Sequence, residues 1–141
     1  MTAFIDTAVI MYAAGSEHAL REPSRRVLSQ LGTADLDGVI SVEVVQEILH
    51  RFISLRRPDA GLALAAQTMD FFAPVLPITQ ALIRRVPDLA IKYPSLAARD
   101  LVHVATCIHE GITDIISPDR GFDQVAEVRR IDPSDFTPDP T

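Results

Sequence analysis

The sequence has few of the residues that mark a disulfide-stapled, zinc-binding or membrane-spanning protein. It has one cysteine and no tryptophan among 141 residues, so no internal disulfide can form and no cysteine cluster can hold zinc. No apolar run approaches the ~18 residues that a membrane helix needs. The N-terminus also lacks the basic and then apolar layout of a signal peptide. From these absences we predict a soluble, cytoplasmic protein.

The chain also lacks an excess of basic charge, since its formal net charge is -6 at pH 7. Nucleic-acid-binding surfaces are usually basic, so this charge at first argues against an RNA or DNA partner. However, arginine supplies 12 of the 13 basic residues, and eight of the arginines form adjacent pairs at 25–26, 56–57, 84–85 and 129–130. Because arginine contacts phosphate with two donors, the pairs leave a nucleic-acid partner open. The alternative is that they lie on solvated helix faces.

Apolar residues make up 48% of the chain, with a mean hydropathy of +0.18, which is enough for one domain of this length to bury a core. We expect that domain to span residues 1–133, followed by an irregular tail rich in proline and aspartate at 134–141. Cys107 lies in the apolar stretch LVHVATCI. We interpret it as a small buried hydrophobic residue and not as a nucleophile.

Short apolar runs alternate with longer helical patterns along the chain. The expected strands are 3–6, 38–41, 75–78, 114–117 and a fifth at 128–131. The expected helices are 20–31, 42–57, 59–72, 80–93 and 97–110, with the fourth kinked or split by Pro87. Strands separated by helices need crossover connections, which favour a parallel sheet covered on both faces. We therefore predict a three-layer α/β/α sandwich with a mainly parallel sheet of four to five strands.

Acidic residues fall where these strands end. Asp6 ends the first strand, and Asp119 closely follows the fourth. Glu43 and Glu47 lie one turn apart in the helix after the second strand. Asp100 lies in the first turn of the helix ARDLVHVATCIHEG. Ligands of open α/β sheets bind beyond the carboxyl ends of the strands, so we expect the acids to meet at that edge.

Each acid alone also has a purely structural explanation. Asp6 can cap the segment TAVIMYAA, Asp100 can complement a helix dipole, Glu47 can be solvated, and Asp119 can be a turn residue. Brought together at one edge, they would repel one another unless a cation lies among them. Oxygen ligands favour Mg²⁺ or Mn²⁺ over zinc. Such an ion polarises a phosphodiester and activates water for in-line attack, which predicts phosphoryl chemistry.

Four segments together resemble the PIN-domain ribonucleases, and specifically the toxins of VapBC-type toxin-antitoxin pairs. The segments are FIDT, ISVEVVQEIL, RDLVHVATC and ISPDRGF, and the resemblance covers essentially the whole chain. It implies that the catalytic, metal-binding acids are Asp6, Glu47, Asp100 and Asp119. In the family pattern the spacing from Ser41 selects Glu47 over Glu43.

The resemblance further implies a Mg²⁺-dependent endoribonuclease that cuts structured RNA such as tRNA or rRNA. It implies a homodimer and a small antitoxin protein that covers the acidic site. The chain departs from the family pattern at Ser117, where threonine is frequent, and at Gly121, where many relatives carry an additional acid. Asp123 is the nearby residue that can take the place of that acid.

Other polar residues lie next to these acids in the sequence. We expect Thr7 and Ser117 to orient a carboxylate or a metal-bound water. Arg99 and Arg120 adjoin site acids and can hold a substrate phosphate, or can form ion pairs with their neighbours.

The histidines carry a weaker signal. His103 lies three residues after Asp100, on the same helix face, but Val102 and Val104 flank it. We interpret His103 as a hydrogen-bonded core residue and not as a metal ligand. The remaining histidines, at 18, 50 and 109, have no companions at ligand spacing.

Two rival functions remain open at this point. A phosphatase of the haloacid-dehalogenase type would use Asp6 as its nucleophile, but that chemistry needs a second acid two residues later, where this chain has Ala8. A non-catalytic PIN-like module would use the acids only to bind basic residues of a partner protein.

Overall fold

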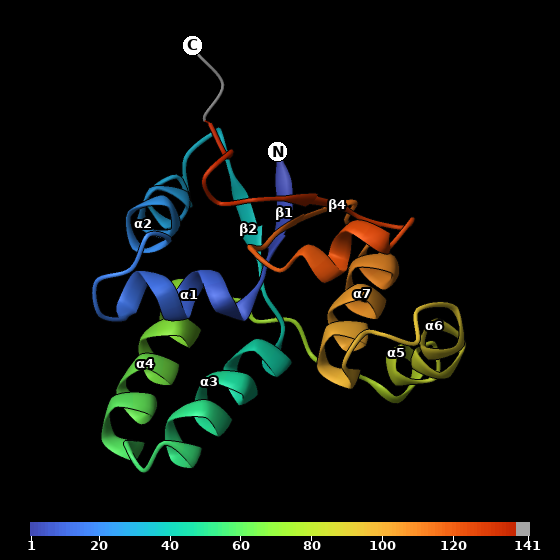
Figure 1. Cartoon of the computed structure of the whole chain (residues 1–141), viewed down its shortest axis with the longest axis horizontal. Helices are drawn as coiled ribbons and strands as arrows, with labels where there is room; N and C mark the ends of the chain where they lie inside the picture. The colour runs from blue at the N-terminus through green and yellow to red at the C-terminus, as the bar shows by residue number, and fades with distance from the viewer. Residues whose placement is uncertain (138–141) are drawn as a thin grey trace.

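The computed structural model describes residues 1–137, which form one parallel sheet with helices packed around it (Figure 1). The strands are β1 (Thr2–Ile5), β2 (Asp37–Val39), β3 (Asp114–Ile116) and β4 (Arg129–Ile131). Their order across the sheet is β2-β1-β3-β4, and every neighbouring pair is parallel. The central strands are apolar because both of their faces are covered: Phe4, Ile5 and Ile115 are fully buried.

The helices occupy most of the chain between the strands. They are α1 (Thr7–Ala14), α2 (Arg21–Ser29), α3 (Val42–Ser54), α4 (Pro58–Phe71), α5 (Gln80–Ile83), α6 (Val86–Lys92), α7 (Ala98–Glu110) and the 3-10 helix η1 (Arg120–Gln124). In Figure 1, α1 and α2 lie to the left of the sheet and α7 lies to its right. The expected α/β fold with a parallel four-stranded sheet is confirmed.

Local sequence signals explain several helix ends. Ser41 caps α3, because its hydroxyl accepts a hydrogen bond from the Glu43 N–H at 3.2 Å. Thr79 caps α5 in the same way through the Leu82 N–H. Gly111 ends α7 with φ of 68°, a left-handed conformation that favours glycine. The capped start of α3 fixes where its acidic residues fall relative to the sheet.

The expected strand at 75–78 does not form. Only Leu76 pairs there: it makes a single parallel bridge with Ser41, and its N–H donates to the Ile40 carbonyl at 3.0 Å. Pro74 and Pro77 flank this position and have no N–H to donate, so a longer ladder cannot be built. The expected split of the fourth helix is confirmed, because α5 ends at Ile83 and Pro87 lies in the first turn of α6.

The last described residues pack against the domain. No helix or strand forms at 134–137, but Phe136 is buried in the core. Residues 138–141 of the expected tail lie outside the described residues, and the expected boundary at 133 stays a prediction. Within residues 1–137, none of the helices combines the length and the apolar character needed to cross a bilayer.

Candidate metal centre

Asp6 lies at the carboxyl end of β1 and only 5% of it is exposed. It occupies the N-cap position of α1, but its side chain makes no capping hydrogen bond. Instead, Oδ2 accepts a hydrogen bond from the Ser117 hydroxyl at 2.5 Å. The alternative interpretation of this carboxylate as a helix cap is therefore wrong. Its burial needs another explanation.

Glu47 and His103 meet Asp6 at this edge of the sheet. The Nε2 atom of His103, on α7, lies 2.8 Å from Oε1 of Glu47, on α3, and 3.8 Å from Oδ1 of Asp6. One ligand atom from each of the three residues lies within 4.8 Å of the others. The helices α3 and α7 therefore both bring polar side chains to the carboxyl end of β1.

The interpretation of His103 as a buried core residue is confirmed, and the structure also brings its ring to the acidic centre. The ring is fully buried, as expected, and its centroid lies 5.0 Å from that of Phe4. Its Nε2 atom contacts Glu47 Oε1, so the ring reaches an acid of the site from within the core. The three-residue spacing between Asp100 and His103 already indicated that the His103 ring lies on the same helix face as that acid.

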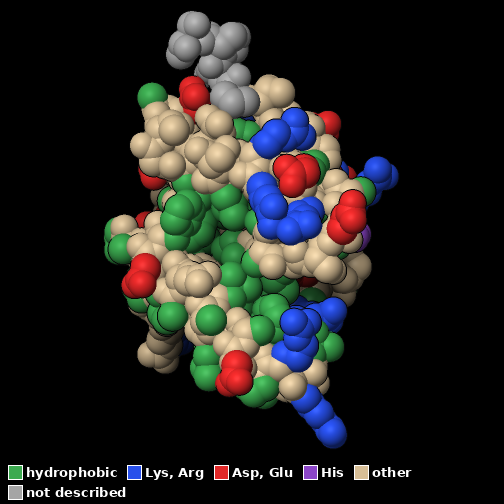
Figure 2. All heavy atoms as spheres, turned by 90° about the vertical axis from the view of Figure 1, so that its left-hand side faces the viewer, with side chains coloured by type: hydrophobic (Ala, Val, Ile, Leu, Met, Phe, Trp, Pro, Cys, Tyr) green, Lys and Arg blue, Asp and Glu red, His purple; other side chains and the backbone are tan. Residues whose placement is uncertain are grey.

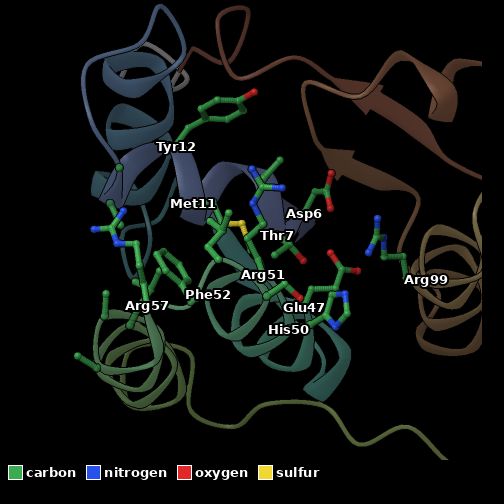
Figure 3. Close-up of a pocket in the computed structure, with 18 of the residues that line it drawn as sticks. Asp6, Thr7, Met11, Tyr12, Glu47, His50, Arg51, Phe52, Arg57 and Arg99 are labelled. Carbon is green, nitrogen blue, oxygen red and sulfur yellow. The ribbon is translucent and has the colours of Figure 1, made fainter.

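Asp6 and Glu47 line a hollow of about 960 Å³ (Figure 3). Asp100 and Asp119 line the same hollow. Asp100 lies in the first turn of α7. Asp119 caps η1, and its Oδ1 accepts a hydrogen bond from the Gly121 N–H at 2.8 Å. The structure therefore brings the four expected acids to one cavity, whereas their role as metal ligands stays a prediction.

The crowding of acids changes their pKa values. Burial raises the pKa of Asp6, and the charge of Glu47 adds to this effect, against His103 and the Ser117 hydrogen bond. Burial, followed by the charge of Asp6, raises the pKa of Asp100 to about 6. The acids therefore lie close enough to disfavour one another's ionisation.

His103 supplies positive charge against this crowding. Burial lowers its pKa, but the contact with Glu47 and the charges of the acids outweigh burial, so the net pKa is raised. For Glu47, burial raises the pKa, but the His103 ring outweighs it and the net pKa is lowered. Glu43, by contrast, has a pKa raised by burial and does not line the cavity. This geometry favours Glu47 over Glu43, as the Ser41 spacing predicted.

The donor set fits a hard divalent cation. Four buried side-chain atoms at this point have no aligned hydrogen bond among residues 1–137: Thr7 Oγ1, Glu47 Oε1 and both ring nitrogens of His103. Buried polar atoms are normally paired. Glu47 Oε1 and His103 Nε2 face each other at 2.8 Å, which leaves Thr7 Oγ1 and His103 Nδ1 without a partner among the described residues. The carboxylate oxygens of the four acids, Asp6, Glu47, Asp100 and Asp119, are the kind of ligand that a hard divalent cation prefers.

Ser117 connects two of the acids. Its hydroxyl donates to Asp6 and accepts from the Asp119 N–H at 3.0 Å. Its own N–H donates to the Ile131 carbonyl, and its carbonyl accepts from Nη1 of Arg130 at 3.1 Å. The hydroxyl, the N–H and the carbonyl of Ser117 therefore all have hydrogen-bond partners, which fits the expected orienting role of this residue.

Asp123 is not in a position to supply an additional acid. Its carboxylate accepts two hydrogen bonds from Arg130, at 2.7 and 3.3 Å, and it does not line the cavity. The expectation for Asp123 is therefore corrected, since Arg130 holds it elsewhere. At Gly121, a Cβ would lie 3.1 Å from Asp119 Oδ1 and 3.2 Å from Leu96 Cδ2, so an acid there is also crowded.

The two candidate phosphate ligands separate in the structure. Arg99 lines the cavity, and its charge contributes to the lowered pKa of Glu47 after His103. Arg120 does not line it; its charge acts on Asp123 instead. Arg130 carries no sequence signal beyond its place in the adjacent pair at 129–130.

The fold and the site together are those of an α/β protein in which four separate segments bring acidic side chains to the carboxyl edge of a parallel sheet. The model of the PIN domain family matches residues 3–128. The chain therefore belongs to the PIN-domain family.

Individual relatives agree with this assignment. The chain is 31% identical over 127 residues to Ribonuclease VapC13 of Mycobacterium tuberculosis, covering 90% of this chain and 97% of the relative. It is 34% identical over 112 residues to Ribonuclease VapC23 of the same species, covering 79% and 88%. A toxin-antitoxin complex from Klebsiella pneumoniae shares the fold, with a TM-score of 0.69, 15% identity and coverage of 95% and 99%.

Proposed function

We propose that this protein is a Mg²⁺-dependent endoribonuclease that hydrolyses RNA phosphodiester bonds, and that it is the toxin of a type II toxin-antitoxin system. The observation that carries this proposal is the buried Asp6 carboxylate, which caps no helix and lies at ligand distance from Glu47 and His103. Similarity to ribonucleases along 90% of the chain supports the same conclusion.

The four acids Asp6, Glu47, Asp100 and Asp119 would hold Mg²⁺ or Mn²⁺. When bound, such an ion stabilises charge on the phosphodiester and lowers the pKa of water. The protein's own groups prepare the site. Ser117 orients the Asp6 carboxylate, and the charge of His103 keeps Glu47 ionised.

Water, and not a side chain, is the attacking nucleophile in this proposal. Cys107 is fully buried, and burial raises the pKa of its thiol to about 12, so no thiolate is present at neutral pH. Ala8 lines the cavity where a haloacid-dehalogenase phosphatase needs its second acid. We propose that Arg99, which lines the cavity, holds a substrate phosphate.

The partners follow from the same reasoning. We propose tRNA or rRNA as the substrate class, a cognate antitoxin protein that covers the acidic cavity, a homodimer, and a cytoplasmic location. The shared fold with a toxin-antitoxin complex supports the antitoxin partner.

The proposal is tested by incubating the protein with total RNA, with and without Mg²⁺, and mapping new 5′ ends. Wild type is expected to create discrete ends only with Mg²⁺. Asp6→Asn is expected to create none while keeping its circular dichroism spectrum, because the variant is isosteric. Undiminished cleavage by Asp6→Asn would contradict the proposal.

A further inference from the structure

The cavity is longer than the acidic centre alone. Its lining continues from the acids between α1 and the α3–α4 pair, past Met11 and Phe52, to Arg57 (Figure 3). We call this part, beyond Glu47, the groove arm; it is lined by Met11, Tyr12, Arg51, Phe52, Arg57 and Leu64. A volume of about 960 Å³ is at the upper end of the range of about 300–1,000 Å³ for ligand sites, so there is room for more than one scissile group.

Two arginines of the groove arm have no acidic partner. Arg51 lies one helical turn after Glu47 on α3, and Arg57 follows the end of that helix. Neither forms an ion pair among residues 1–137. In a chain with a net charge of -6, two free guanidinium groups beside a phosphate-cleaving site concentrate an anion there.

Aromatic rings accompany these charges. Tyr12 stacks on His18 with centroids 4.5 Å apart, and the Arg57 guanidinium lies 5.9 Å from the centroid of Phe52. Seen from the side of α2 and α4, a band of apolar side chains crosses the molecule, with basic side chains and some acidic ones along its right-hand side (Figure 2). Rings combined with uncompensated cations are the arrangement that binds single-stranded nucleic acid.

We infer that the groove arm binds the single-stranded RNA that flanks the cleaved phosphate, with Arg51 and Arg57 on successive phosphates and Tyr12 stacked on a base. This inference rests on the proposed nuclease function and names the part of the substrate that the site holds. Arg51 serves the phosphate nearest the acids because it lies one turn from Glu47. A basic peptide is the competing occupant, but the like charges of Arg51 and Arg57 would repel it.

Binding is measured by fluorescence anisotropy of a labelled single-stranded oligoadenylate of about 12 nucleotides, a length that spans such a groove. All proteins carry Asp6→Asn, so that no cleavage occurs. Arg51→Gln and Arg57→Gln are each expected to weaken binding about tenfold and to reduce the slope of log affinity against log salt by about 1. Tyr12→Ala is expected to weaken binding by a similar factor, and Tyr12→Phe to retain it.

Arg56→Gln is the matched control. Arg56 adjoins Arg57 in the same turn and is exposed, but it does not line the cavity. It is expected to keep both the affinity and the salt slope. Equal losses in Arg56→Gln and Arg57→Gln would overturn the inference, because they would indicate attraction to net charge alone. Unchanged binding in Arg51→Gln and Arg57→Gln would overturn it as well.

Two further readouts separate this inference from the proposed function. In the active background, Arg51→Gln is expected to raise KM about tenfold at nearly unchanged kcat. Cleavage by wild type with an unaltered KM in the arginine variants would leave the nuclease in place and refute the RNA groove. Groove variants that lose affinity for a peptide partner but not for oligoadenylate would likewise refute it.

Discussion

At the scale of single residues, the acidic centre lowers the free energy of unfolding of the metal-free protein. Burial and neighbouring carboxylates raise the pKa values of Asp6 and Asp100, and only His103 brings a buried positive charge among the groups that line or contact the site. A carboxylate whose pKa rises on folding favours the folded state when protonated and opposes it when ionised. The metal-free centre is therefore a source of instability at neutral pH.

Asp100 gives this argument a measurable sign. Burial and the charge of Asp6 raise the pKa of Asp100 to about 6 in the folded protein, above its ordinary value of 3.8. Its contribution to the free energy of unfolding is therefore full below about pH 4 and lost as the pH rises through about 6. In EDTA, Asp100→Asn is expected to be more stable than wild type near pH 7 and nearly equal to it near pH 4. Urea unfolding at both pH values checks this, and a less stable Asn variant near pH 7 would contradict it.

Ser117 is the second residue with a clear expectation. Its hydroxyl is the hydrogen-bond donor to Asp6 and the acceptor for the Asp119 N–H, in a fully buried position. Ser117→Ala leaves both groups without this partner and is expected to lower the free energy of unfolding by about 1–3 kcal/mol. Ser117→Thr keeps the hydroxyl and is expected to recover most of the loss. Equal unfolding midpoints for the two variants would count against this role.

At the scale of elements, an edge strand holds the acidic centre in place. Arg130, on β4, has a side chain only 12% exposed, and it bonds Asp123 in η1, the Ser117 carbonyl after β3, and Asp132. It thereby fixes the turn that carries Ser117 and Asp119. The next residue toward the N-terminus, Arg129, has a side chain 72% exposed and pairs only with Asp114.

This contrast supplies a matched pair of variants. Arg130→Met is expected to lower the free energy of unfolding by about 1.5 kcal/mol and to weaken Mn²⁺ binding, because Asp119 loses its fixed position relative to Asp6. Arg129→Met is expected to cost no more than about 0.5 kcal/mol and to leave Mn²⁺ affinity unchanged. Urea unfolding measures the stability of the two variants, and calorimetric titration with Mn²⁺ measures their affinities. Equal Mn²⁺ affinities in the two variants would show that the hydrogen bonds of Arg130 do not act on the site.

The elements also show where sequence patterns were sufficient. The cap at Ser41 predicted the start of α3, and the glycine at 111 predicted the end of α7, because capping depends on adjacent residues. The expected end of α3 at residue 57 was too late, since α3 ends at Ser54. The expected strand at 75–78 failed because its apolar side chains were counted without the missing N–H groups of Pro74 and Pro77. Backbone hydrogen bonding, and not hydrophobicity, decided that segment.

At the scale of the whole molecule, ion binding and folding are linked. An ion that binds only the folded protein stabilises it, by about 2.7 kcal/mol at a concentration of ~100 times Kd. We therefore expect Mg²⁺ to raise the melting temperature of wild type and to leave that of Asp6→Asn unchanged. Differential scanning fluorimetry measures this shift. A non-catalytic partner-binding module with a plain acidic surface would show little response in either protein.

The candidate site was predictable only in part, for reasons that belong to the whole fold. Asp6 and Asp119 could be found because they end or follow strands of one parallel sheet, and Asp100 because it lies in the first turn of a helix. Glu47 was preferred to Glu43 only through the family pattern. His103 and Arg130 could not be assigned, because their roles depend on which atoms face them across the packed helices and strands. The sequence alone also could not predict that Arg51 and Arg57 lack an acidic partner among residues 1–137, because ion pairs depend on the folded arrangement.

The two ends of the described chain lie close together, at the amino end of β1. Met1 and Phe136 line one small hollow, beside the amino end of β1, whereas the acids lie past the opposite, carboxyl end of that strand. An affinity handle or fluorescent protein fused ahead of Met1 would therefore be carried at the rear of the molecule. A surface-immobilised sample prepared in this way would keep its cavity turned toward the solution, ready for an incoming strand.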